Sequence, residues 1–65
     1  MVNLEVRLSL DSDLIFPDYV RVIDEEERER EYHYLVYVSV KDEDYDDFIF
    51  FLYLHHEEVI SYEVY

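Results

Sequence analysis

The chain has 65 residues, of which 18 are Asp or Glu and 5 are Lys or Arg, so its formal net charge is −13. This charge excludes a nucleic-acid-binding protein that works through phosphate contacts, because such proteins need clustered Lys and Arg to release counterions. The residues are 51% hydrophobic and 18% aromatic, which excludes a disordered acidic tail. A chain of this length has room for one small core, so we expect a single domain over residues 1–65.

Cysteine is absent, which removes disulfides and thiolate metal sites and suits a reducing cytosol. The N-terminal residues show no basic segment ahead of an apolar run, so no signal peptide is predicted. The longest apolar run covers residues 48–54, far fewer than the ~20 residues that span a bilayer. We therefore expect a soluble, cytoplasmic protein.

The first predicted element is a strand over residues 2–10. Apolar and polar residues alternate there with a period of two, which is typical of a half-buried strand, although an amphipathic helix remains an alternative. Residues 11–13 break the pattern, as a turn or as the polar end of an edge strand.

A short helix is predicted from Pro17 to about Asp24, with a charged continuation. Pro17 and Asp18 suit the first turn of a helix, where a fixed φ and a negative charge near the positive end of the dipole are favourable. Val20 and Ile23 fall three apart, on one face. The β-branched residues of this segment leave a strand as the alternative.

Three strands are predicted after the helix, at residues 32–40, 48–54 and 59–65. The first alternates, whereas the second is apolar on both faces, which is typical of the central strand of a covered sheet. Residues 42–47 are predicted to form an acidic loop and residues 55–58 a short connection. The predicted fold class is α+β: a single small antiparallel β-sheet of about four strands, with a C-terminal meander, covered by one short helix.

The best metal motif is a calcium-loop pattern with Asp42, Asp44 and Asp46 at its first, third and fifth positions. Asp47 stands where the sharp turn needs Gly, and Tyr53 stands where a bidentate Glu closes the site. A solvated acidic loop explains the same residues, so no metal is predicted there.

Zinc binding and catalysis also find little support. His33, His55 and His56, with Glu57 or Glu58, are possible ligand types, but metalloprotease spacing is absent and adjacent residues of a strand point to opposite faces. The four Ser residues have no nucleophile elbow and no Gly for an oxyanion loop. Paired carboxylates need a cleft that so small a fold hardly provides. We predict no enzyme activity, no metal and no cofactor.

The distribution of the acids carries more information than their total. Fourteen of the 18 fall in three runs, at residues 11–18, 24–31 and 42–47, and their repulsion opposes folding. Solubility or adaptation to high salt is one explanation. Mimicry of DNA is the other: Asp11 and Asp13 would lie ~6.6 Å apart on an extended strand, against ~3.4 Å between charges along one DNA strand. Such a surface is drawn to a basic DNA-binding groove.

The stretch over residues 11–20, Asp-Ser-Asp-Leu-Ile-Phe-Pro-Asp-Tyr-Val, resembles the signature segment of phage uracil-DNA glycosylase inhibitors. The matching features are an acid-Ser pair, an apolar run, a Pro, a following acid and an apolar helix position, which fall at Asp11 and Ser12, residues 14–16, Pro17, Asp18 and Val20. Residues 51–55, together with residues 17–21, are similar to segments of the staphylococcal inhibitors of the same enzyme. The sequence departs from the pattern at Asp13, where an apolar residue is expected, and at Tyr19, where a second acid is expected.

The resemblance implies an acidic antiparallel sheet with helices that occupies the DNA groove of the glycosylase. The residues expected nearest the enzyme are Asp11, Ser12 and Asp18, and Asp13 is also expected to bind the partner. The two longer acid runs are expected to supply the electrostatic field. The resemblance also implies an apolar pocket between helix and sheet, which holds a hydrophobic side chain of the enzyme. The candidate lining residues are Ile15, Val20, Ile23, Val36, Val38, Phe50 and Leu52, and an ordinary core explains the same residues equally well.

The expected function is therefore competitive inhibition of host uracil-DNA glycosylase, in the cytoplasm of the host cell if the protein is phage-encoded. Two alternatives stay open. The first is an acidic mimic directed at another nucleic-acid-binding protein, such as a restriction, CRISPR or transcription protein. The second is an antitoxin-like partner of a basic protein, which dimerises through a strand edge.

Overall fold

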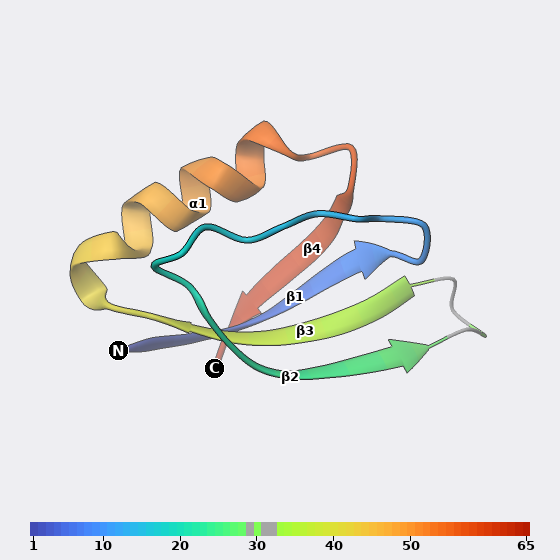
Figure 1. Cartoon of the computed structure of the whole chain (residues 1–65), viewed down its shortest axis with the longest axis horizontal. Coiled ribbons are helices and arrows are strands. Elements are labelled where there is room, and N and C mark those ends of the chain that lie inside the picture. Colours follow the sequence, from blue (N-terminus) through green and yellow to red (C-terminus); the bar gives the residue numbers. More distant parts are fainter. Residues whose placement is uncertain (29, 31–32) are drawn as a thin grey trace.

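The computed structural model describes residues 1–28, 30 and 33–65. Within these residues four antiparallel strands form one sheet in the order β2-β3-β1-β4; the strands are β1 (Val2–Ser9), β2 (Arg21–Arg28), β3 (His33–Val40) and β4 (Val59–Val64). A 3-10 turn, η2 (Asp42–Asp44), leads directly into the helix α1 (Tyr45–Leu54), which covers one face of the sheet (Figure 1). The predicted class, a small α+β fold with one antiparallel sheet and one short helix, is confirmed.

The strands β1 and β3 lie within the strands predicted over residues 2–10 and 32–40; residue 32 is outside the described residues. They pair along their whole length, from Val2 opposite Val40 to Ser9 opposite His33. The apolar side chains of one face are buried beneath α1 and form most of the core: Leu4, Val6 and Leu8 of β1, and Val36, Val38 and Val40 of β3. Because β4 pairs with the other side of β1, β1 is an interior strand. Residues 11–13, which follow β1, therefore do not extend a strand at the edge of the sheet.

The prediction of a helix from Pro17 to Asp24 is wrong, and the strand alternative is right. A tight turn, in which the N–H of Val20 donates to the carbonyl oxygen of Pro17 at 3.0 Å, directs the chain into β2. The strand β2 pairs with β3, with a register shift at Ile23. β-branched side chains favour extended backbone, and pairing with a strand already in the core outweighs the weak helix preference of the acids that follow.

The prediction of a strand over residues 48–54 is also wrong, because these residues form most of α1. Phe48 and Leu52, one helical turn apart, are buried, whereas Phe50 between them is 61% exposed. Acids in the first turn, such as Asp46, favour a helix start through the helix dipole. A short apolar run fits a buried helix as well as a buried strand.

The C-terminal meander is therefore replaced by a strand-helix-strand connection. The turn over residues 55–58 joins α1 to β4, as a connection was predicted there, but β4 crosses beyond β3 and pairs with β1. The acids of residues 42–47 belong to η2 and to the first turn of α1 instead of a loop.

The chain between β1 and β2 completes the layer above the core. The centroid of its Phe16 ring lies 6.0 Å from the ring centroid of Phe48 and 6.1 Å from that of Phe51. Leu14 and Val20 also pack against the core. Figure 1 shows this segment running beside α1 on the same side of the sheet. We call the opposite face of the sheet, which α1 does not cover, the open face.

Candidate functional site: an acidic sheet edge

Four consecutive acids of β2 form a line of negative charge at one edge of the sheet. Their side chains are all exposed, and we call them the acidic edge: Asp24, Glu25, Glu26 and Glu27. Successive residues of a strand advance about 3.3 Å, so the acidic edge carries about one negative charge per 3.3 Å. This spacing is close to the ~3.4 Å between successive charges along one strand of DNA.

The register with β3 shows how these carboxylates are directed. Asp24 pairs with Tyr37 on the open face, and Glu25 pairs with Val36 on the face that α1 covers. Because side chains alternate along a strand, the other two carboxylates repeat this arrangement one step further on. The acidic edge therefore presents charge on both sides of the sheet as well as along its rim.

Two further acids extend the negative charge across the open face. Glu5 of β1 pairs with Glu63 of β4 on one side and with Tyr37 on the other, and Tyr37 pairs in turn with Asp24. This row holds three carboxylates and one phenol. Partial burial, followed by the charges of Glu5 and Glu26, raises the pKa of Tyr37 above its ordinary value, so its hydroxyl is protonated at neutral pH.

Little of this charge is neutralised locally. Arg28 Nε lies 3.1 Å from Glu26 Oε1, and the amino group of Met1 lies 3.2 Å from Asp42; these are the ion pairs found between residues that the structure describes. The Tyr37 hydroxyl donates to Glu26 Oε2 at 3.4 Å. Exposed ion pairs of this kind stabilise a protein by ~1 kcal/mol or less, so the field of the acidic edge remains strongly negative.

The sequence-predicted acids lie elsewhere. Asp11, Asp13 and Asp18 are exposed, but they belong to the connection between β1 and β2 and not to an edge strand. The ~6.6 Å spacing of carboxylates on an edge strand, predicted for Asp11 and Asp13, occurs instead in β2. The signal for it was present in the sequence as the longest run of acids, and it was missed because that run was predicted to continue a helix.

Ser12, also predicted to meet the partner, is used within the fold. Its hydroxyl donates to Glu58 Oε2 at 3.0 Å and accepts from the N–H of Leu14 at 3.2 Å. The hydroxyl of Tyr34 lies 3.4 Å from the Ser12 carbonyl oxygen, to which it donates. These contacts fasten the segment after β1 to the turn before β4, and they leave Ser12 half-buried.

The predicted apolar lining divides between the core and the surface. Val36, Val38 and Leu52 are buried core residues, with Val20 packed against them. The other three are exposed, to 85% for Ile15, 54% for Ile23 and 61% for Phe50. The seven residues do not surround one cavity.

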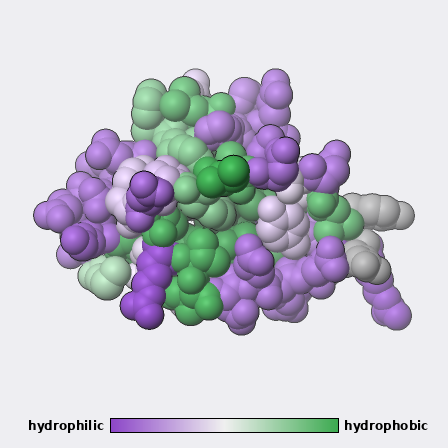
Figure 2. All heavy atoms as spheres, in the orientation of Figure 1, coloured by the Kyte–Doolittle hydropathy of each residue, from purple (hydrophilic) through white to green (hydrophobic). Residues whose placement is uncertain are grey.

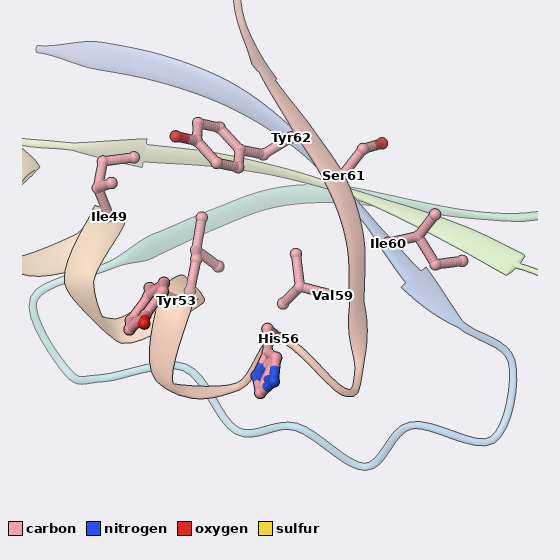
Figure 3. Close-up of a pocket in the computed structure, with 8 residues that line it drawn as sticks. Ile49, Tyr53, His56, Val59, Ile60, Ser61 and Tyr62 are labelled. Carbon is pink, nitrogen blue, oxygen red and sulfur yellow. The ribbon is translucent and has the colours of Figure 1, made fainter.

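An apolar groove does lie between helix and sheet, but at the β4 edge. Its volume is about 290 Å³, and Figure 3 shows side chains of α1 and its C-terminal turn facing those of β4. The lining residues are Ile49, Leu52, Tyr53, His56, Val59, Ile60, Ser61 and Tyr62. Of the predicted lining residues, Leu52 alone lines this groove. The helix was predicted to precede β3 in the chain, whereas α1 follows it.

The residues of the possible calcium and zinc motifs lie on different elements of the structure. Asp42 and Asp44 lie in η2 and Asp46 lies in α1, so the three aspartates do not share a calcium-binding loop. His33 lies on β3, whereas His55 and His56 follow α1. Within the described part of the chain, no group of three or more His, Asp or Glu side chains is arranged to hold a metal ion.

Comparison of the chain with protein-family models, with curated protein sequences and with solved structures found no match. In the described residues no helix has the length and apolar character needed to cross a membrane.

Proposed function

We propose that the protein is an inhibitor that imitates the DNA backbone and occupies the basic DNA-binding groove of uracil-DNA glycosylase, where it blocks uracil excision. The observation that carries the proposal is the acidic edge, in which four exposed carboxylates follow an edge strand at about the charge spacing of one DNA strand. The choice of target rests on the resemblance of residues 11–20 to phage inhibitors of that enzyme.

The mechanism needs no turnover. A DNA-binding groove is lined by cations that attract phosphates over distances near the Debye length, ~8 Å at physiological salt. The same field attracts the acidic edge and raises the association rate. Once docked, the edge excludes DNA because both ligands use the same cations.

The location of the contact differs from the one that the resemblance implies. We assign it to β2 because Asp24 to Glu27 lie on a strand at the rim of the sheet, whereas Asp11, Asp13 and Asp18 lie in a connection. The carboxylates of the connection between β1 and β2 then add to the long-range electrostatic field, but they do not occupy positions that DNA phosphates would take in the groove. The apolar groove lies at the opposite edge of the sheet, and the proposal does not use it.

The test is a uracil-excision assay with three matched double variants, each of which removes two charges. Glu25→Gln with Glu27→Gln removes two of the four charges of the acidic edge, Asp11→Asn with Asp18→Asn removes two of the three charges of the segment of resemblance, and Glu43→Gln with Glu57→Gln is the control at other exposed positions. We expect the edge variant to raise the inhibition constant at least tenfold, and the other two to raise it only a few-fold.

The outcomes separate the target from the mechanism. If uracil excision proceeds unchanged beside excess protein, the assignment to the glycosylase is wrong. Displacement of DNA from a different basic protein, such as a restriction nuclease, would then identify another target of the same mimicry. If the protein displaces DNA from neither, the acidic edge does not imitate DNA.

A further inference from the structure

The second edge of the sheet has the opposite character to the acidic edge. β4 pairs with β1 on one side, and its other side faces away from the sheet. Apolar side chains stand exposed along it, with exposed fractions of 55% for Ile60, 43% for Tyr62 and 52% for Val64, and its single acid is Glu63. An exposed apolar edge strand is a template for pairing with another strand.

The surface beside β4 extends this apolar edge. Tyr53 of α1, which is 72% exposed, lines the apolar groove together with the half-buried Ile49 and Val59. In Figure 3 the side chains of Val59 and Tyr62 point toward α1, while that of Ile60 lies on the other side of the β4 ribbon. Figure 2 shows hydrophobic residues gathered over the C-terminal half of α1 and hydrophilic residues at its start. We call the apolar edge and the groove together the β4 surface.

We propose that the β4 surface binds a second copy of the chain, so that two β4 strands pair antiparallel and form a continuous eight-stranded sheet. Antiparallel pairing of identical edge strands is two-fold symmetric, which makes the surface complementary to itself. A basic partner of the kind proposed above would be drawn to the other edge, because β4 offers it a single carboxylate. The inference stands apart from the proposed function.

The strand order explains why a chain of net charge −13 can pair with itself at this edge. β2 is the strand farthest from β4 in the sheet. With neighbouring strands about 4.8 Å apart, the acidic edges of the two copies would lie about 34 Å apart, and each would lie about 19 Å from the other copy's β4. Both distances exceed the ~8 Å Debye length at physiological salt, so the acidic edges oppose the dimer only weakly.

The backbone also indicates the register. The N–H of Tyr65 donates to the carbonyl oxygen of Asn3 at 3.0 Å, and Glu63 and Ser61 continue this register with β1. Because alternate residues of an antiparallel strand bond to the same neighbour, the backbone groups of Tyr62 and Val64 face outward. A two-fold axis at Tyr62 uses these groups.

An axis at Tyr62 also sets compatible side chains opposite each other. It places Ser61 opposite Glu63 of the other copy on the open face, and Tyr62 opposite Tyr62 on the face that α1 covers. An axis at Glu63 would set two carboxylates directly against each other, which is unfavourable. The expected dimer is therefore centred on Tyr62.

Sedimentation equilibrium of the full chain, over a wide concentration range and at low and high NaCl, tests the proposal. We expect a reversible monomer-dimer equilibrium that strengthens with salt. Val64→Lys should weaken dimerisation at least tenfold. Val22→Lys is the matched control, because Val22 is 44% exposed on the opposite edge strand, and it should leave the association constant within twofold.

Amide hydrogen exchange gives a second measurement on the unmodified protein. The N–H groups of Tyr62 and Val64 should become protected as the concentration rises, while those of β2 should not change. Circular dichroism verifies that each variant folds. A wild-type chain that stays monomeric at millimolar concentration in 0.5 M NaCl, or a dimer that Val22→Lys disrupts and Val64→Lys leaves intact, would overturn the proposal.

Discussion

Glu5 and Glu63 stand directly opposite each other on the neighbouring strands β1 and β4. Like charges at directly opposed positions of an antiparallel pair destabilise the sheet, typically by ~0.2–1 kcal/mol. The charges of Glu5 and Glu63 therefore oppose the pairing of β1 with β4.

The first prediction follows from that pair. Glu63→Gln should raise the free energy of unfolding by about 0.5 kcal/mol, because it removes the repulsion of Glu5 without loss of an ion pair. Urea denaturation at low salt measures this change. Glu43→Gln, at an exposed position of η2, is the control and should have a smaller effect. Equal effects of the two substitutions would show that only the total charge matters.

Salt should stabilise the folded monomer. Self-repulsion of a chain with net charge −13 favours expansion, and 0.5 M NaCl shortens the Debye length to about 4 Å. We expect the denaturation midpoint to rise between 0.01 and 0.5 M NaCl at low protein concentration, where association is absent. A midpoint that falls with salt would mean that attractive ion pairs dominate the surface.

Ser12 should contribute to stability more than its place in a connection suggests. Ser12→Ala removes the bond to Glu58 and leaves the Leu14 N–H without its acceptor, so we expect a loss of about 1–2 kcal/mol. Ser61→Ala, on the exposed strand β4, should cost less than 0.5 kcal/mol. Thermal unfolding of the two variants compares them. If the loss at Ser12 does not exceed that at Ser61, Ser12 does not anchor the connection.

The tyrosines predict a loss of stability in alkali. Burial raises the pKa of Tyr34 above its ordinary value; a hydrogen bond with the Ser12 side chain opposes this increase, and the negative charges of Glu25 and Glu58 add to it. In the unfolded chain Tyr ionises near pH 10, so the native contribution is complete below that pH. It is lost as the pH rises from there through the higher pKa of the folded state. Urea midpoints between pH 8 and 11 should fall only above about pH 10, and less steeply for Tyr34→Phe.

The orientation of α1 can be tested by two substitutions of the same kind. Phe48 is fully buried and Phe50 is 61% exposed, so Phe48→Ala should cost about 3–5 kcal/mol and Phe50→Ala less than 1 kcal/mol. Had residues 48–54 formed a strand, the two side chains would share one face and the costs would be similar. Circular dichroism with urea denaturation distinguishes these outcomes.

The elements that the sequence predicted correctly are those in which one pattern fits one structure. β1 alternates between apolar and polar residues, and β3 places apolar residues at every second position from Tyr34 to Val40; a helix would not bury either set on one face. Residues 48–54 failed because a run that is apolar at every position fits a buried helix and a buried strand alike. The strand over Asp24 to Glu27 was not predicted because Glu favours helix over strand locally, and pairing with β3 makes these residues extended.

By itself the sequence determined the net charge, the class of fold and the two central strands, since these depend on composition and local periodicity. The tertiary structure alone decided where the charge lies. By inserting β1 between β3 and β4, it places the line of acids at one edge of the sheet and the apolar strand at the other. Strand order depends on long-range pairing, which no local pattern records, and this order separates the acidic edge from the β4 surface.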